Sequence, residues 1–413
     1  MDRARPHVAR ALLFALLAGA AHAADEDGDS PQPAPVAPAP PVVDVGEVTV
    51  TATRAERSVL DVPGNVTVID RAAIERSGAR DVAELLRREA GIFVANTTTN
   101  PDGWLVDARG FNDGGGNGSS LLVLVNGRRV NEPDTSSADW SWLRLDDVER
   151  IEIVRGPASA LWGDGAMSGV VNVLTRGAEG PLELDLRGWS GTYDTDGGSL
   201  FARGTRGDVS GSLYLDRPHT DGYRDDAGYS AHRAEGSVRW SPDERVVLGV
   251  DSGWSSDDRE RPGALTKQQI DDLGRRAANP FVNDDRLERR RFHVEGVADV
   301  ALLEDLTLKL APFYAERSDA GQITSPPDDV FDSTVDVDSE GVSLLAQLDR
   351  PLAGLSNRLV VGTDLLFEHV DVDALFSSSF GDFPTRNHTS RHVYGGSCGC
   401  ARGSRRKIGR AHV

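Results

Sequence analysis

The stretch that decides the fold is VERIEIVRGPASALWGDGAMSGVVNVLTR, Val148 to Arg176. It contains Ile151-Glu-Ile-Val154, a run typical of a β-strand. The strand leads into Arg155-Gly-Pro157, and the glycine-rich residues that follow indicate turns. The stretch therefore predicts the last strand and closing turns of a compact unit.

Residues 59–176 as a whole predict a mixed α/β unit and not a repeat. Asn65–Ile69 has the composition of a strand. Asp81 followed by Glu84 is a capping-box start for the helix DVAELLRREA, and Gly91 ends that helix. Helix and strand signals thus alternate within one short segment.

A hairpin is predicted between Leu121–Val125 and Arg128–Val130, because Asn126-Gly127 is the strongest short hairpin signal. The preceding glycine-rich run, Asp113–Ser119, lacks the lysine and the following helix of a phosphate-binding loop. We interpret it as a flexible loop.

From Leu182 onward the sequence changes to strict alternation of apolar and polar residues, as in Leu182–Arg187. This places the apolar side chains on one face of each strand. The pattern recurs in segments 208–216, 233–240, 306–310 and 342–349. It predicts an antiparallel sheet, in a soluble sandwich or in a membrane barrel.

Connection lengths separate these two folds, because outer-membrane barrels have short turns at one end and long loops at the other. Here short links are interleaved with long polar segments; the links are 206–208, 241–244 and 300–305, and the long segments are 217–230, 255–289 and 316–338. The alternation favours a barrel, of which about nine strands are present.

The N-terminus carries an export signal. Arg3, Arg5 and Arg10 precede the apolar run ALLFALLAGAA, and Ala21-His-Ala23 is a small-residue cleavage site, so we interpret residues 1–23 as a signal peptide. The run is shorter than the roughly 20 residues of a spanning helix. Residues 24–45 are acidic and then Pro/Ala-rich, which predicts an extended linker.

Composition excludes several classes of function. The net charge of -20 argues against a nucleic-acid partner. Cys398 and Cys400 both lie near the C-terminus, so the body of the chain has no thiol for a disulfide or a metal. We find no nucleophile–base set, metal-ligand spacing or nucleotide loop, and we predict no enzyme activity, no cofactor and no metal site.

In their order and spacing these segments resemble the TonB-dependent outer-membrane receptors. GEVTVTATR, residues 46–54, resembles the TonB box; VPGNVTVIDRAAIE and DVAELLRREAGI resemble the opening of the plug domain; ARGF, LVLVNGRRVN and the stretch Val148–Arg176 match later plug motifs. The resemblance implies a mixed α/β plug domain, residues 55–178, followed by an antiparallel transmembrane β-barrel from residue 179 in the cell outer membrane.

The resemblance also implies partners and site residues. An extended box can add as a strand to a sheet edge of TonB, which belongs to an energised inner-membrane complex; the predicted TonB-binding residues are Glu47, Val48, Thr49, Val50, Thr51 and Ala52. Arg109 and Arg155, with Glu152, are predicted to lock the plug to barrel glutamates that come from later strands.

A metal chelate or another small molecule is the expected ligand, with ferric siderophores first and cobalamin next. Plug loops near Trp104, Asn112 and Asn117 are predicted to contact it. The Asp-rich pieces 221–226 and 328–338 match no EF-hand spacing, and we interpret them as solvated loops, with calcium binding as the alternative.

The barrel is predicted to be incomplete, because roughly 22 strands require several hundred residues after the plug. Residues 395–413 lose the alternation, and KIGRAHV resembles a translated sequencing adapter, so we interpret this tail as non-native. Three alternatives to import are a signal transducer, a β-rich outer-membrane or secreted receptor without transport, and a non-functional fragment.

Overall fold

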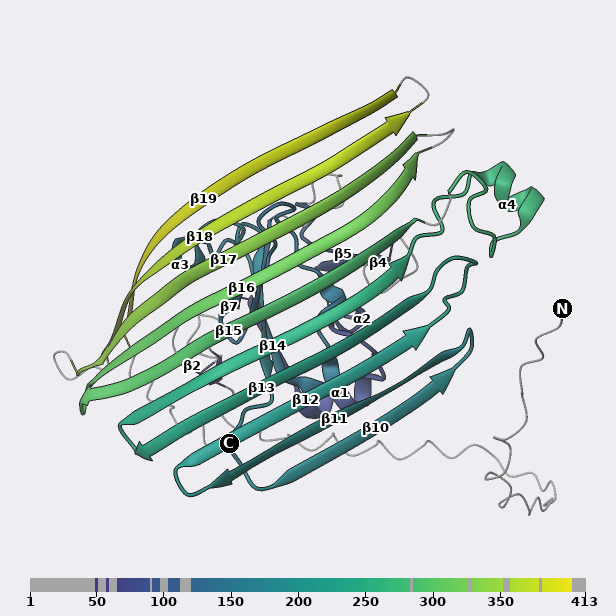
Figure 1. Cartoon of the computed structure of the whole chain (residues 1–413). Helices are drawn as coiled ribbons and strands as arrows, with labels where there is room; N and C mark the ends of the chain where they lie inside the picture. Colours follow the sequence, from purple (N-terminus) through teal and green to yellow (C-terminus); the bar gives the residue numbers. More distant parts are fainter. Residues whose placement is uncertain are drawn as a thin grey trace, which may run out of the picture. The chain divides into compact units, whose positions relative to one another are not determined.

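The computed structural model describes residues 49–50, 57–58, 65–89, 91–96, 103–111, 120–282, 285–325, 329–351, 357–378 and 381–402. The signal peptide, the linker and most of the TonB box lie outside these ranges. Two assemblies of strands follow one another: an α/β unit formed by residues 65–175, called the plug unit below, and a large antiparallel sheet (Figure 1).

The plug unit is built on a five-stranded sheet of order β3-β8-β9-β6-β7, in which only β6 and β9 are parallel. Its strands are β3 (Asn65–Asp70), β6 (Leu121–Val125), β7 (Arg128–Arg129), β8 (Val148–Arg155) and β9 (Gly169–Thr175). A separate hairpin pairs β4 (Ile92–Asn96) with β5 (Trp104–Ala108). The helical elements are α1 (Arg71–Ser77), α2 (Val82–Leu86), η2 (Trp140–Trp142), η3 (Leu145–Asp147) and α3 (Ser159–Trp162).

The predicted helix start is confirmed, but the helix is short. Asp81 caps α2 by accepting a hydrogen bond from the Glu84 N–H at 2.8 Å. The Glu84 carboxylate accepts from the Arg80 N–H, one residue before the cap, so only half of the predicted capping box forms. The α-helix ends at Leu86, before the predicted stop at Gly91.

The predicted hairpin between β6 and β7 is also confirmed. Asn126 and Gly127 have φ values of 52° and 87°, as the hairpin turn requires. The Asn126 side chain donates to Thr175 Oγ1 at 2.9 Å and accepts from the Thr175 N–H at 3.0 Å. The turn is therefore fastened to the end of β9.

The main core of the plug unit lies on one face of its sheet, and a smaller apolar cluster around Leu122 and Leu124 lies on the other. Val82, Leu86, Ile151 and Val171 are fully buried, together with most of β6. Burial of apolar surface from segments far apart in sequence is the main source of stability in such a unit.

Gly169 permits the closest backbone approach in this sheet, because a Cβ added there would lie 2.5 Å from the Val154 carbonyl oxygen. We expect Gly169→Ala to destabilise the plug unit by about 1–3 kcal/mol, the usual cost of overpacking. The urea midpoint of unfolding measures this. Gly177→Ala is the matched control, because nothing lies within 4 Å of its added Cβ, and equal midpoints for the two variants would contradict the assignment.

The large sheet consists of ten antiparallel strands in chain order, where the sequence predicted about nine. They are β10 (Glu183–Gly191), β11 (Thr195–Arg206), β12 (Val209–Thr220), β13 (Tyr229–Asp243), β14 (Val246–Glu260), β15 (Arg286–Leu303), β16 (Leu306–Ser325), β17 (Asp329–Asp349), β18 (Asn357–Ser378) and β19 (Gly381–Arg402). The helix α4 (Lys267–Leu273) lies in the β14–β15 loop.

The three predicted short links and two of the three predicted long connections occur at opposite ends of this sheet. Two-residue turns join β11 to β12, β13 to β14 and β15 to β16, whereas residues 221–228 and 261–282 belong to long connections at the other end. Strands β10 to β19 therefore form an antiparallel sheet of the type expected for a barrel.

The prediction of a long loop at 316–338 was wrong. Strand β16 continues to Ser325 and β17 begins at Asp329, with the ladder paired from Leu306↔Leu348 to Ser325↔Asp329. Beyond Tyr314 the outer face is mostly polar, whereas Val335 and Val337 lie opposite Asp319 and Arg317 on the inner face. The outer apolar stripe therefore ends although the backbone ladder continues. The Asp-rich piece at 329–338 is therefore part of a strand.

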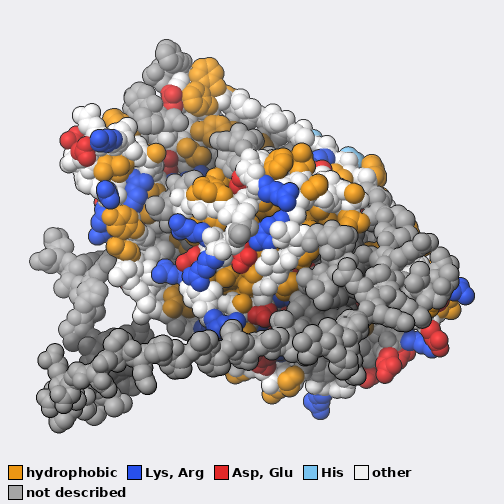
Figure 2. All heavy atoms as spheres, turned by 180° about the vertical axis from the view of Figure 1, so that it is seen from behind, with side chains coloured by type: hydrophobic (Ala, Val, Ile, Leu, Met, Phe, Trp, Pro, Cys, Tyr) orange, Lys and Arg blue, Asp and Glu red, His pale blue; other side chains and the backbone are white. Residues whose placement is uncertain are grey.

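The two faces of the large sheet differ as the alternation predicted. Leu184, Leu186, Val238 and Trp240 are exposed on the outer face, by 63%, 67%, 55% and 48%. The inner face carries buried polar residues, among them Asp216, Arg233, Arg259 and Arg317. Seen from behind, basic and acidic side chains are interspersed with apolar ones (Figure 2).

Candidate functional site: the plug–sheet latch

The contact between the plug unit and the large sheet centres on Asp139, which begins the short helix η2. Its Oδ1 accepts a hydrogen bond from the Ser141 N–H at 2.8 Å, which fixes the carboxylate. Its Oδ2 accepts from Arg259 Nη2 at 3.0 Å, Arg289 Nη1 at 2.6 Å and Arg291 Nη2 at 2.8 Å. One plug carboxylate thus joins two strands of the sheet, β14 and β15.

Two further plug carboxylates extend this contact to β16. Glu132 bridges neighbouring strands, with Oε1 at 3.1 Å from Arg291 Nη2 and Oε2 at 2.9 Å from Arg317 Nη1. Asp134 accepts from Arg317 Nη2 at 2.6 Å. We call these three plug carboxylates and the arginines Arg259, Arg289, Arg291 and Arg317 the latch.

The strand register explains why the sheet needs these carboxylates. Arg291 lies directly opposite Arg317 in the β15–β16 ladder, and facing like charges destabilise a strand pair. Arg289 faces Asp319 in the same ladder and is bonded to it at 2.5 Å. The sheet thus neutralises Arg289 through Asp319. Arg291 and Arg317 have only longer sheet contacts among the described residues, 4.0 Å to Asp257 and 3.5 Å to Asp319, and their closer partners are plug carboxylates.

Because the latch is buried, removing one of its charged groups is strongly destabilising. Arg259 is 1% exposed and Asp139 is 9% exposed, so neither group is well hydrated. Removing one partner of a buried pair leaves an uncompensated charge, which costs far more than an exposed pair contributes. Loss of one latch residue should therefore lower the stability of the plug–sheet contact.

Asp139 is ionised under all ordinary conditions. Burial alone would raise its pKa, but the guanidinium groups of Arg259, Arg291 and Arg289 outweigh burial and hold the pKa well below the usual value of 3.8. A depressed pKa in the folded state stabilises the fold above the unfolded pKa and loses that effect as the pH falls through the folded pKa. The latch therefore persists at neutral and mildly acidic pH.

A second group of contacts lies beside the latch, around Arg233 of β13. Arg233 Nη2 donates to the Ser141 carbonyl oxygen at 2.9 Å and to the Tyr229 hydroxyl at 2.6 Å, while Nη1 contacts Asp216. Arg144 of the plug approaches the same Asp216 at 3.6 Å. The η2 turn is thereby held on both of its sides.

The remaining polar contacts between plug and sheet also come from the second half of the plug. They are Asp146 with Arg187 (2.7 Å) and Ser199 (2.9 Å), Arg128 with Glu295 (3.3 Å) and Asp164 with Arg391 (3.5 Å). Side chains of residues 65–89 form no hydrogen bond or ion pair with the described residues of β10–β19. The plug is thus attached to the sheet through its later half.

A cavity of about 800 Å³ lies between the plug unit and the sheet. Glu132, Trp162, Glu235, Arg291 and Glu368 are among its lining residues. Its volume is in the range of small-molecule sites, roughly 300–1,000 Å³.

The predicted lock residues all belong to the plug unit, where Arg109 is exposed and Glu152 is buried. Arg155 donates to Thr67 Oγ1 at 2.6 Å and contacts Glu89 at 3.2 Å, and the Arg109 guanidinium lies beside Gly156. Glu152 is fully buried and contacts Arg150 at 3.0 Å. These contacts are all within the plug, and the predicted pairing with glutamates of later strands stays a prediction.

Of the predicted TonB-binding residues, the structure describes the backbone of two. Thr49 and Val50 form β1, which pairs antiparallel with Arg57–Ser58, the strand β2. Glu47, Val48, Thr51 and Ala52 lie outside the described residues. The box segment is thus extended at its centre, the conformation that strand addition requires.

The predicted ligand contacts stay predictions. The Trp104 indole donates to Asp81 Oδ2 at 3.2 Å and packs against the plug core. Asn112 and Asn117 lie outside the described residues.

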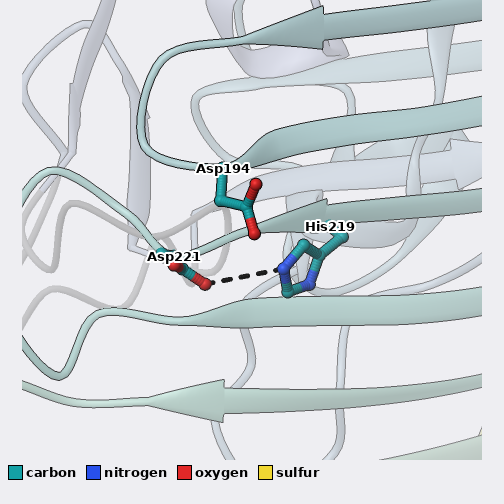
Figure 3. Close-up of side chains that lie close together, drawn as sticks. All are labelled: Asp194, His219 and Asp221. Carbon is teal, nitrogen blue, oxygen red and sulfur yellow. Dashed lines mark ion pairs between the residues drawn. The ribbon is translucent and has the colours of Figure 1, made fainter. Parts of the chain in front are cut away.

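One group of metal-capable side chains occurs within the described ranges: Asp194, His219 and Asp221, at the loop end of β10–β12 (Figure 3). His219 Nε2 lies 3.5 Å from Asp221 Oδ1, and both aspartates are exposed. The group includes one residue of the Asp-rich piece 221–226, for which calcium binding was the alternative interpretation.

Asp147 gives the plug a pH dependence. Burial raises the pKa of its carboxyl to about 8, although Arg176 and Arg71 oppose the shift. Between about pH 4 and pH 8 the folded plug keeps a proton on Asp147 that the unfolded chain has released. The free energy of unfolding therefore decreases as the pH rises through this range, by at most about 1.4 kcal/mol per pH unit. We expect Asp147→Asn to flatten this slope in urea unfolding at pH 5, 7 and 9; an unchanged slope would contradict the assignment.

The latch was not predicted, although the sequence carries part of its signal. Arg289 and Arg291 are two residues apart and share one strand face, but they fall at the edge of a segment that we expected to be a loop. Glu132, Asp134 and Asp139 follow the predicted hairpin in a polar run.

No helix in the described ranges is long and apolar enough to cross a membrane. Comparisons with known proteins identify the family. Residues 58–170 match the family model described as TonB-dependent Receptor Plug Domain. The vitamin B12 transporter BtuB of Photobacterium profundum is 28% identical over 254 residues, which are 58% of this chain and 41% of that protein.

The ferric enterobactin receptor of Pseudomonas aeruginosa is 32% identical over 191 residues, 43% of this chain and 23% of that receptor. The crystal structure of the ferric citrate transporter FecA in the unliganded form superposes with a TM-score of 0.71 at 19% identity, covering 84% of this chain and 55% of that one. The chain thus spans about half or less of the proteins it matches. With its plug domain and its antiparallel sheet, the chain belongs to the TonB-dependent receptors of the outer membrane.

Proposed function

We propose that the protein takes part in TonB-dependent import of a scarce small ligand across the outer membrane. The observation that carries the proposal is a plug domain held on the inner face of the sheet by the latch, with a cavity of about 800 Å³ beside it. A plugged pore does not conduct passively, so import requires work on the plug.

TonB is the proposed source of that work. The box strand at Thr49–Val50 offers main-chain hydrogen bonds to a sheet edge of TonB, and these bonds resist a pull along the chain. Force applied there reaches β3 first, which is an edge strand paired only with β8. The latch, in the later half of the plug, holds against it.

The proposed ligand is a ferric siderophore, with cobalamin as the second candidate. Support for the first comes from the ferric enterobactin receptor at 32% identity, and for the second from a vitamin B12 transporter at 28%. These two identities are similar, so they do not decide between the two ligands.

Uptake measurements test the proposal. A strain that lacks the gene should lose accumulation of one labelled ligand, either an iron-55 chelate or cobalt-57 cobalamin, and the complete gene should restore it. Restored uptake should disappear when an uncoupler removes the proton-motive force. Ligand binding without energy-dependent accumulation would instead favour a receptor that does not transport, and neither binding nor accumulation would favour a non-functional gene product.

A further inference from the structure

Three connections at the loop end of the large sheet form one braced assembly. They are the turn 192–194, the loop 221–228 and the described residues 261–282 of the β14–β15 loop. Arg224 joins the two loops, donating to the carbonyl oxygens of Pro262 (3.2 Å), Gly263 (2.5 Å) and Ala277 (2.9 Å). The Asp221 N–H donates to the Tyr193 carbonyl oxygen at 2.9 Å, which ties in the turn.

Each connection contributes one side chain to a patch of two tyrosines and an arginine. Tyr193 and Tyr223 meet edge to face, with ring centroids 5.6 Å apart and planes at 88°. The Arg276 guanidinium carbon lies 5.3 Å from the first centroid and 5.9 Å from the second. Arg276 Nε donates to the Tyr223 carbonyl oxygen at 3.1 Å, and the Arg276 carbonyl accepts from Asp225 N–H at 2.7 Å, so the backbone of both loops positions the patch.

The patch is built but not buried. Tyr193 is 41% exposed and Tyr223 is 43% exposed, so both rings remain partly accessible to a ligand. The terminal nitrogens of Arg276 meet no hydrogen-bond acceptor among the described residues. Two available guanidinium N–H groups beside partly exposed rings are a preformed recognition surface, because the loops already hold these side chains in place.

The chemistry of the patch selects one class of ligand. The guanidinium fork offers two parallel N–H donors, which match two adjacent anionic oxygens. The tyrosine rings offer π-faces to a planar aryl group. Asp194 and Asp221 border the patch and disfavour an anion whose charge is spread over the whole molecule.

We propose that the patch of Tyr193, Tyr223 and Arg276 binds a planar aryl group that carries adjacent anionic oxygens, as part of the imported ligand. This inference rests on the proposed function in that it names a ligand class for the same receptor. Capture at this rim precedes entry into the cavity and needs neither TonB nor energy.

The test uses the full chain, purified in detergent, with 2,3-dihydroxybenzoate as the aryl probe and cyclohexanecarboxylate as an equally charged probe without a π-face. Equilibrium dialysis gives the dissociation constants. We expect the aryl probe to bind and Arg276→Gln to weaken it about tenfold or more, the scale of one charge-assisted hydrogen bond. Arg275→Gln, an exposed neighbour of the same charge, should leave binding unchanged.

Arg276→Gln also removes a loop contact, so a second variant separates recognition from loop integrity. Tyr223→Leu keeps the carbonyl oxygen that Arg276 contacts but removes a ring face, and it should weaken the aryl probe several-fold. Limited proteolysis at 261–285 should match wild type for this variant.

Three results would overturn the inference: no saturable aryl binding at millimolar concentration, equal binding of the two probes, or equal weakening by Arg275→Gln. The dialysis experiment measures binding without transport, so a negative uptake result does not affect its interpretation. A negative dialysis result in turn does not contradict the proposed import.

Discussion

Val50→Pro should reduce energy-dependent uptake to background while ligand binding stays at the wild-type level. Val50 lies in the extended pair Thr49↔Ser58 and Val50↔Arg57, and proline removes its backbone N–H donor. If TonB grips the box by strand addition, the missing donor interrupts the ladder at its centre. Labelled-ligand uptake and binding, measured on the same cells carrying the complete gene, separate the two steps.

Val50→Thr is the matched control, because threonine keeps both the N–H donor and a strand-forming side chain. It should transport normally. Wild-type uptake in Val50→Pro would contradict the assignment of residues 46–54 as the TonB-binding segment. Equal loss of ligand binding in both variants would instead indicate a folding defect.

Asp139→Ala should loosen the plug–sheet contact around η2, at a cost of about 3–5 kcal/mol, because it leaves buried arginines without their shared carboxylate. Arg259 and Arg291 lose the acceptor that lies 3.0 Å and 2.8 Å away. Amide hydrogen exchange around residues 131–143 should accelerate sharply. The urea midpoint of the plug should fall with it.

Asp164→Ala is the comparison that isolates burial. Asp164 also joins plug and sheet through Arg391, but its side chain is 52% exposed, and exposed pairs contribute only about 0–1 kcal/mol. If the two variants exchange at the same rate, the latch does not hold the plug, and the attachment must lie in contacts with other residues.

Local patterns predicted most of the fold. The Asn126-Gly127 turn and the Asp81 cap act within a few residues, and the alternation after Leu182 reports one apolar face, so each can be read from a short window. The ends of β16 and β17 could not be predicted, because beyond Tyr314 the outer face of this strand pair is mostly polar and its apolar residues Val335 and Val337 lie on the inner face, so the outer apolar stripe ends before the ladder does.

The site was harder to predict, because its contacts join segments far apart in the chain. Arg289 and Asp139 are 150 residues apart, and no local pattern marks them as partners. From the family motifs we predicted that two plug arginines, Arg109 and Arg155, pair with glutamates of the barrel. In the described structure the polarity at the sheet is mostly the reverse, with plug carboxylates bonded to sheet arginines.

The facing pair Arg291 and Arg317 has a consequence for biogenesis. Without the plug carboxylates, Asp257 of β14 and Asp319 of β16 remain as counter-charges for the four latch arginines. Pairing of β15 with β16 then proceeds against electrostatic repulsion until Glu132 and Asp134 arrive. We therefore expect the plug carboxylates to favour the pairing of β15 with β16 during assembly.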